Sequence, residues 1–118
     1  MPHVVLEHAQ STLHAFQAIE PITLKIDTGI LKLGDKYINA AETSVLIEAL
    51  AIEQGKTQNF FIQLSQKQAN LTVRLLPLTD PEKSPGVKIL MATVAKQIKD
   101  SNPAISYGKT NLQDYLLL

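Results

Sequence analysis

Alternating apolar and polar positions predict a strand at the start of the chain. Residues 3–8 read HVVLEH, and the β-branched Val4 and Val5 favour extended backbone. Pro2 stands directly before this run, at a place where a strand tolerates a missing N–H. Because side chains alternate between the two faces of a strand, we expect Pro2 and His8 to share one face.

Helix signals follow over residues 9–34. Ser11 or Thr12 is a candidate N-cap, and Pro21 suits the first position of a helix that runs through residues 22–26. Gly29 or Gly34 would end that helix. The proline leaves two arrangements open, which are one broken helix or a loop followed by a short helix.

The middle of the chain has the pattern of a β-hairpin. Two apolar runs, SVLIEALAIE and NFFIQLSQ, flank a polar turn that contains Gly55. The first run is compatible with a helix as well, because Ala, Leu and Glu favour helices. Residues 70–78, NLTVRLLPL, are a further strand candidate with Pro77 near its end.

A second helix is predicted over residues 85–100. Its apolar side chains recur at helical spacing and form one face; they are Val87, Leu90, Met91, Val94 and Ile98. A short strand over residues 104–110 and an apolar tail over residues 111–118 complete the chain. The order of strand, helix, strand pair, helix and strand indicates an α+β protein with two β-α-β units, each with a right-handed crossover.

Length and composition restrict the class of protein. The chain is expected to form a single domain over residues 1–118. Apolar residues make up 45% and charged residues 19%, which is typical of a compact fold. Eleven basic and eleven acidic side chains balance, and Arg74 is the sole arginine, so no nucleic-acid partner is expected. A signal-peptide pattern and an apolar run of about 20 residues are both absent, which predicts a cytoplasmic protein with no membrane partner.

Residues that bind metals or cofactors form no motif in this sequence. The chain lacks cysteine, and the spacing of His3, His8 and His14 does not match a common metal-binding pair. A Gly-rich phosphate loop and a Ser/His/Asp constellation are also absent. We therefore expect neither a metal nor a cofactor.

Four segments carry a resemblance to a known family. They are MPHVVLEH, TGILKLG, GKTQNFFIQLSQK and KSPGVKILMATVAKQIK. Together they resemble the tautomerase superfamily, and within it the branch of 5-carboxymethyl-2-hydroxymuconate isomerase. The resemblance spans nearly the whole chain and is most specific at the amino-terminal Met-Pro-His. Between Gln68 and Pro81 the chain carries an additional strand relative to the family pattern.

This resemblance implies both a fold and an activity. The fold would be tautomerase-like, with two fused β-α-β units whose helices pack on one face of a mixed sheet, assembled as a homotrimer. The activity would be that of an isomerase, a keto–enol tautomerase that shifts a proton in a small unsaturated 2-hydroxy or 2-oxo carboxylic acid. The catalytic base would be Pro2, once removal of Met1 frees its secondary amine. An ordinary terminal amine has a pKa of about 7.7–8.0, which is close to the pH at which a general base works best.

The carboxylate-binding arginines of that family do not map onto this chain. Lys36 and Lys83 are the nearest cations, and lysine lacks the two-pronged donor geometry of arginine. His8, on the expected face of Pro2, and Phe61 are further candidates for contact with the carboxylate substrate, although Phe61 also suits a core or trimer contact. Two alternatives therefore stay open, which are a non-catalytic oligomeric binding or structural protein of the same fold and an unrelated α+β interaction domain.

Overall fold

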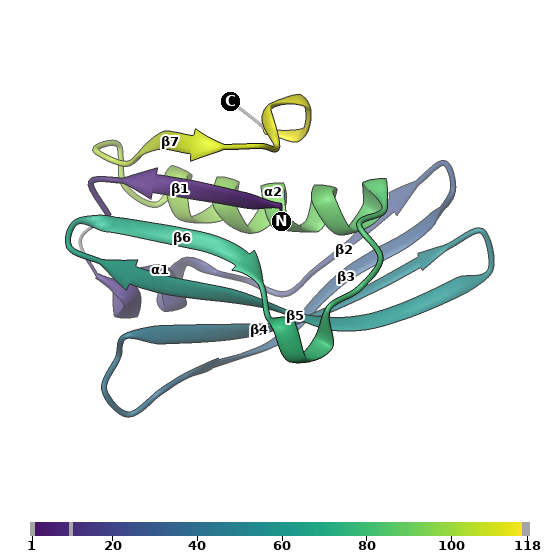
Figure 1. Ribbon diagram of the computed structural model, residues 1–118, viewed down its shortest axis with the longest axis horizontal. Helices are drawn as coiled ribbons and strands as arrows, with labels where there is room; N and C mark the ends of the chain where they lie inside the picture. Colours follow the sequence, from purple (N-terminus) through teal and green to yellow (C-terminus); the bar gives the residue numbers. More distant parts are fainter. Residues whose placement is uncertain (1, 10, 117–118) are drawn as a thin grey trace.

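Seven strands and two helices make up the part of the chain that the computed structural model describes, residues 2–9 and 11–116 (Figure 1). The strands are β1 His3–Glu7, β2 Ile22–Ile26, β3 Gly29–Ile38, β4 Ser44–Glu53, β5 Lys56–Lys67, β6 Asn70–Leu75 and β7 Ser106–Thr110. The helices are α1 Thr12–Ala18 and α2 Pro85–Asp100, and two 3₁₀ turns are η1 Pro77–Thr79 and η2 Gln113–Tyr115. The protein is of the α+β class, as the sequence predicts.

The seven strands form one sheet in the order β2-β3-β4-β5-β6-β1-β7. Every neighbouring pair of the described strands is antiparallel. The prediction of a mixed sheet with parallel pairs inside two β-α-β units is therefore wrong. The reason lies in the connections: Ile26 pairs with Gly29 across a two-residue turn, so β2 leads straight into an antiparallel neighbour.

The sheet curls so that one face encloses α2, which lies behind β1 in Figure 1. Along β4 and β5 buried residues alternate with partly exposed ones, as expected when a strand has one face on the core. Ala15 of α1 and Leu90 of α2 belong to the same buried cluster as Val45 of β4 and Ile62 of β5. Both helices thus pack on one face of the sheet, which agrees with the prediction.

Helix α2 confirms the helix predicted over residues 85–100. All five apolar residues of its predicted face are buried. Gly86, Ala92, Thr93 and Ala95 are buried as well, so the helix is enclosed on more than one side. No helix in the described part of the chain is long and apolar enough to cross a membrane.

The segment after β1 differs most from its prediction. Ser11 caps α1, because its Oγ accepts a hydrogen bond from the His14 N–H at 3.0 Å. Helix α1 ends at Ala18, however, and the helix expected after Pro21 is wrong, since the β2–β3 hairpin occupies this place. The sequence ITLKI of β2 alternates between partly buried apolar and exposed polar residues, a period of two that fits a strand and not a helix.

The later strands follow the sequence closely. The β4–β5 hairpin turns at Gln54 and Gly55, which both have positive φ, and the ambiguous run SVLIEALAIE is strand β4. The additional strand predicted between Gln68 and Pro81 is β6, and the last predicted strand is β7. In the apolar tail Leu112 is buried and Tyr115 packs against the core, while residues 117–118 lie outside the described part.

The amino-terminal strand ends one residue earlier than its pattern predicts. Pro2 is buried, as are Val4 and Leu6 of β1. β1 ends at Glu7, and His8 lies in a turn with a φ of 64° and an exposed side chain. The prediction that His8 shares the face of Pro2 is therefore wrong, because the chain has left the strand at that point.

The first turn of α2 is tied to β4 by Glu53. Its carboxylate accepts hydrogen bonds from the Gly86 N–H at 3.0 Å and from the Ser84 hydroxyl, and Ser84 Oγ accepts from the Val87 N–H. A negative group is favourable at the amino end of a helix. Gly86 permits the close approach, since a Cβ there would lie 2.7 Å from Leu31 Cδ2 and 2.6 Å from the Glu53 carboxylate.

Replacement of Glu53 is expected to weaken this attachment. Glu53→Ala should lower the free energy of unfolding by about 1–3 kcal/mol, because two donors at the start of α2 lose their charged acceptor. Urea denaturation followed by circular dichroism measures the loss. Glu20→Ala, at an exposed side chain, is the matched control, and an equal loss in both variants contradicts the role of Glu53.

Candidate functional site

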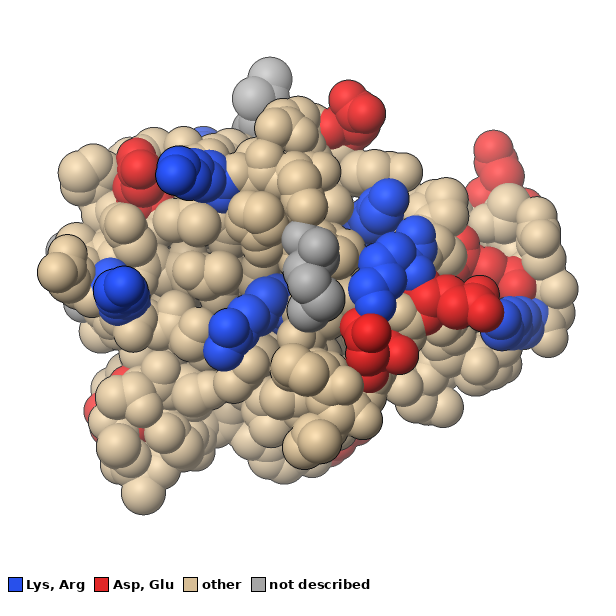
Figure 2. Space-filling view, in the orientation of Figure 1, with Lys and Arg blue, Asp and Glu red and all other residues tan. Residues whose placement is uncertain are grey.

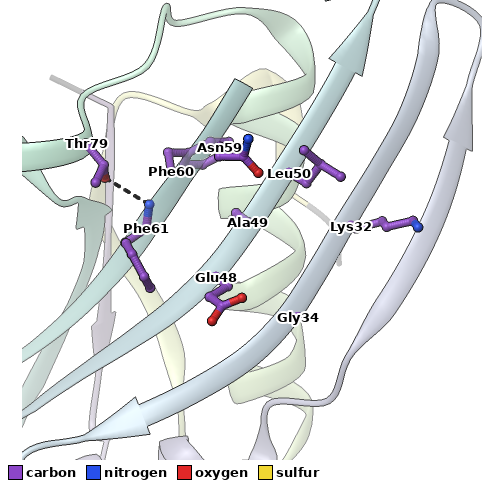
Figure 3. Close-up of a pocket in the computed structure, with 9 residues that line it drawn as sticks. All are labelled: Lys32, Gly34, Glu48, Ala49, Leu50, Asn59, Phe60, Phe61 and Thr79. Atoms are coloured by element: carbon purple, nitrogen blue, oxygen red, sulfur yellow. Dashed lines mark hydrogen bonds between the residues drawn. The ribbon is translucent and has the colours of Figure 1, made fainter. Parts of the chain in front are cut away.

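A pocket of about 440 Å³ lies on the outer face of the sheet, the side turned away from the helices (Figure 3). Its volume falls within the range of about 300–1,000 Å³ that is usual for small-molecule sites. Three neighbouring strands and η1 supply the lining. The lining residues are Lys32 and Gly34 of β3, Glu48, Ala49 and Leu50 of β4, Asn59, Phe60 and Phe61 of β5, and Thr79 of η1.

Strand alternation brings the side chains of the pocket onto one face. Glu48 and Leu50 flank the buried Ala49 on β4, so their side chains point outward. Phe61 of β5 lies directly opposite Glu48, and Lys32 of β3 lies opposite Leu50. Two apolar side chains therefore adjoin Glu48 on this face, Leu50 along the same strand and Phe61 across on β5, and Lys32 lies beyond Leu50 on β3.

Gly34 leaves room beside Glu48. The register between β3 and β4 shifts between Leu33 and Lys36, so Gly34 lies within a β-bulge. A Cβ at Gly34 would meet the Glu48 side chain at 3.6 Å, which is ordinary van der Waals contact. A larger side chain at this position would occupy the space next to Glu48 without striking the backbone.

Glu48 is a half-buried carboxylate with a single strong partner. The Tyr37 hydroxyl donates a hydrogen bond to Glu48 Oε2 at 2.6 Å. Among residues 2–9 and 11–116 the ion pairs join Lys56 with Glu82, Lys83 with Asp80 and Lys96 with Asp100, so none involves Glu48. The carboxylate is thus open to a cationic or N–H donor group of a ligand.

The turn η1 closes one side of the pocket. The Phe61 N–H donates to Thr79 Oγ1 at 3.0 Å, the bond drawn in Figure 3, and the Leu76 N–H donates to the Phe61 carbonyl at 3.0 Å. Within the turn, the Thr79 N–H donates to the Leu76 carbonyl at 3.1 Å. These bonds hold η1 against β5 and leave Leu78 at its tip, 92% exposed.

A second, smaller hollow of about 210 Å³ lies beside the β4–β5 hairpin. Its polar groups already bond to one another: Lys56 forms an ion pair with Glu82, and the Gln58 amide bonds the backbone N–H and carbonyl of Glu82. Glu53, in the same lining, caps α2. These contacts hold the loop before α2 in place and give this hollow a structural role.

On the face of the molecule that Figure 2 shows, Lys and Arg lie among Asp and Glu, and uncharged residues cover most of the surface. In the described part of the chain, no group of three or more His, Asp or Glu side chains is placed to hold a metal ion. The outer-face pocket therefore has hydrogen-bonding groups, one carboxylate (Glu48) and one ammonium group (Lys32) with which to bind a ligand.

The residues proposed from the sequence as a substrate site are spread over the molecule. Pro2 is buried at the start of β1 and lines neither of the two hollows. The removal of Met1, on which its role as a base depends, concerns a residue outside the described part. His8 is exposed in the turn after β1. Phe61 is the one member of this set that lines the outer-face pocket.

Both proposed carboxylate-binding lysines already have partners. Lys36 Nζ donates to the carbonyls of Phe16 at 2.6 Å and Ile19 at 2.8 Å, which satisfies the end of α1, and it lies 4.7 Å from the centre of the Phe16 ring. Lys83 Nζ bonds Asp80 and the Pro81 carbonyl. The structure thus does not bring either lysine to Pro2 or to the pocket lining.

Sequence reasoning passed over the polar residues that the structure does bring together. Glu48 stands inside an apolar run, SVLIEALAIE, and its outward direction follows once that run is a strand. Gly34 and Lys32 lie in a segment that was expected to hold the end of a helix. The sequence signal for these residues is the alternation of buried and partly exposed positions in β4, which directs Glu48 outward, together with Gly34 on the neighbouring strand β3.

No family model, curated protein or solved structure matches the chain. The fold class and the site therefore rest on the geometry described above.

The contact between Tyr37 and Glu48 can be checked by titration. The hydrogen bond to Glu48 raises the pKa of Tyr37 above its ordinary value of 10.0, with smaller contributions from desolvation and from the charges of Glu48 and Asp35. The folded chain therefore retains the phenol proton more strongly than the unfolded chain. This contribution to stability is complete below pH 10 and is lost as the pH rises through the raised pKa.

Glu48→Gln is expected to return the pKa of Tyr37 toward 10, because the charged acceptor is gone. Tyrosinate absorbance measured against pH reports the titration, and the difference from a Tyr37→Phe variant isolates this residue from the other two tyrosines. An unchanged pKa in Glu48→Gln contradicts the assigned hydrogen bond.

Proposed function

We propose that the protein is a non-catalytic binding protein whose site is the outer-face pocket. The observation that carries this proposal is the Glu48 carboxylate, which is half-buried beside an apolar wall and has no ion pair within residues 2–9 and 11–116. The Tyr37 hydroxyl satisfies Oε2, whereas Oε1 has no hydrogen-bond partner among the described residues. A ligand that brings a cation to Glu48 supplies that partner.

The lining defines the ligand as an apolar group that carries an amine. Leu50 and Phe61 accept the apolar part, and Glu48 Oε1 accepts hydrogen bonds from the ammonium while Oε2 stays with Tyr37. Asn59 and Thr79 add polar groups at the edge of the pocket. This arrangement of an apolar wall with a few convergent polar groups is typical of small-ligand sites.

A carboxylate ligand is the competing chemistry, since Lys32 also lines the pocket. Lys32 is exposed, whereas Glu48 is half-buried. An ion pair in contact with water contributes little, and partial removal from water strengthens it. The pocket is therefore expected to prefer a cation at Glu48 over an anion at Lys32.

Two probes with the same ring and opposite charges test this preference. 2-Phenylethylamine is expected to bind with a dissociation constant of about 1 mM, ordinary for a ligand of this size, and 3-phenylpropionate at least about tenfold more weakly. Chemical-shift changes in the amide spectrum of the isotope-labelled chain measure both affinities and locate the site.

Two variants control the binding measurement. Gly34→Leu is expected to abolish binding of the amine by filling the space beside Glu48, and Glu48→Gln to weaken it about tenfold by removing the charge. Thr23→Leu, at an exposed position of β2, is the control for an added leucine. Equal binding of the two probes, or binding that survives in Gly34→Leu, contradicts the proposal.

The isomerase predicted from the family resemblance is a second proposal. It is supported by the place of Pro2, which is buried at the tip of β1 where few bonds can rotate. In this proposal a free Pro2 amine shifts the proton of a small unsaturated 2-hydroxy or 2-oxo acid within a homotrimer. The antiparallel sheet and the distribution of Lys36, Lys83 and His8 do not favour it, so it ranks below the binding protein.

Catalysis by Pro2 has a direct test. If the proposal holds, the native protein lacks Met1 by intact mass and accelerates the tautomerisation of phenylpyruvate, and Pro2→Ala reduces the rate at least about 100-fold, as loss of a general base does. Circular dichroism of the variant controls for folding. Retention of Met1, or an unchanged rate in Pro2→Ala, contradicts the isomerase.

A further inference from the structure

Strand β2 forms one edge of the sheet, and its free side presents backbone groups that no other strand bonds. Ile26 and Gly29 flank a two-residue turn, so they exchange both of their backbone hydrogen bonds. Bonded pairs alternate along an antiparallel ladder, so every second residue of β2, counted back from Ile26, is bonded to β3. Thr23 and Lys25 therefore direct their N–H and C=O groups to the free edge, where none of the described residues bonds them.

The opposite edge, β7, is less suited to accept a further strand. Its register with β1 shifts between Val4 and Leu6, which marks a bulge. The Thr110 carbonyl at its end accepts a hydrogen bond from the Gln113 side-chain amide at 2.7 Å. Bulges and covering groups are devices that keep an edge strand from pairing. β2 pairs with β3 along its whole length without a shift, so it is the regular edge of this sheet.

The outer side of the β2 edge is basic. The side chains of Thr23 and Lys25 are exposed there, and the exposed Lys32 of β3 lies opposite Thr23. In Figure 3 the Lys32 side chain points away from Glu48, toward the strand on the other side of β3, which is β2. Neither lysine forms an ion pair with any residue in the described part of the chain.

The inner side of the β2 edge is apolar. Ile22, Leu24 and Ile26 pack against the core but remain partly exposed, because no strand lies beyond them. An additional strand with apolar side chains on this side would remove more of their surface from water, and burial of apolar surface is favourable.

We propose that the edge of β2 binds an extended segment of another protein as an additional antiparallel strand. The segment carries acidic side chains opposite Thr23 and Lys25 and apolar side chains opposite the three apolar residues of β2. Backbone hydrogen bonds give such strand addition its affinity, and the alternating side chains give it specificity. This inference goes beyond the outer-face pocket, since it needs neither Glu48 nor a small ligand.

The charges of the edge favour a partner different from this chain. A second copy of β2 would bring its own Lys25 and Lys32 to the same outer face, and like charges on neighbouring strands are destabilising. β2 has only five residues, which is short for the roughly 800 Å² that each partner of a stable dimer buries. Lysine on an edge strand thus deters an identical edge and attracts an acidic one.

Two blocked peptides that differ only in charge test the proposal. The acidic probe is Ser-Val-Glu-Val-Glu-Val-Ser, and its control has lysine in place of both glutamates. The acidic probe is expected to bind with a dissociation constant of about 100 µM and the basic probe at least about tenfold more weakly. Chemical-shift changes in the amide spectrum of the isotope-labelled full chain measure both affinities and are expected to centre on β2.

Methylation of peptide nitrogens tests the backbone contact itself. In the proposed register the two glutamates direct their N–H groups to β2, whereas the valines direct theirs to solvent. N-methylation of both glutamates is expected to weaken binding at least about tenfold, and N-methylation of two valines about threefold or less. Equal effects of the two modifications overturn strand addition.

A charge reversal on each edge locates the binding site on the molecule. Lys25→Glu is expected to weaken the acidic probe at least about tenfold, since it places like charges opposite each other. Lys109→Glu, at an exposed lysine of the opposite edge strand, is the matched control with an expected change of about twofold or less. Equal losses in both variants contradict a site at β2.

Hydrogen exchange of the free chain tests whether the edge is open. The amides of Thr23 and Lys25 are expected to exchange fast and those of Leu24 and Ile26 slowly, with the first pair slowed by the acidic probe. Protection of the first pair without peptide overturns the proposal, as does absence of binding up to about 1 mM of the acidic probe. A dimer of the free chain that the peptide dissociates identifies a second copy as the occupant and also overturns it.

Discussion

The fold depends on the burial of α2 against one face of a single antiparallel sheet. Nine of the sixteen residues of this helix are buried, on more than one side, so the strands must curl around it. Both helices pack on the enclosed face, so neither of them covers the opposite face. Where β6 gives way to η1 beyond Leu75, that uncovered face becomes a pocket bounded by the turn. Glu48 and Lys32 line this pocket and take no part in the core.

Much of the fold can be predicted from local patterns, and the errors have a common origin. The second helix, the β4–β5 hairpin and the Ser11 cap depend on signals within a few residues, and all three are confirmed. The proline predicts a helix after residue 21, because proline suits a first helical turn, but the alternation of the five residues of β2 fits the strand that is observed. The predicted parallel pairing rests on element order, which does not determine how strands far apart in the sequence pair.

The candidate site is less predictable because it is assembled across strands. Phe61 was selected from its sequence, but its neighbour Glu48 becomes visible only through the register of β4 with β5. Lys36 is a candidate for substrate contact by its charge, and the structure adds that two carbonyls at the end of α1 accept hydrogen bonds from it. A lysine near a helix end has a local partner available, and that partner comes before any ligand.

The place of β1 in the sheet affects how the chain is synthesised. β1 precedes the six other described strands, yet its two neighbours are β6 and β7, from residues 70–75 and 106–110. A ribosome adds about 5–20 residues per second, so β1 emerges seconds before either neighbour exists. The hairpins from β2 to β5 need only nearby residues and can form meanwhile. The amino-terminal strand is thus the segment most exposed to incorrect pairing or chaperone binding during translation, and the sheet closes last around it.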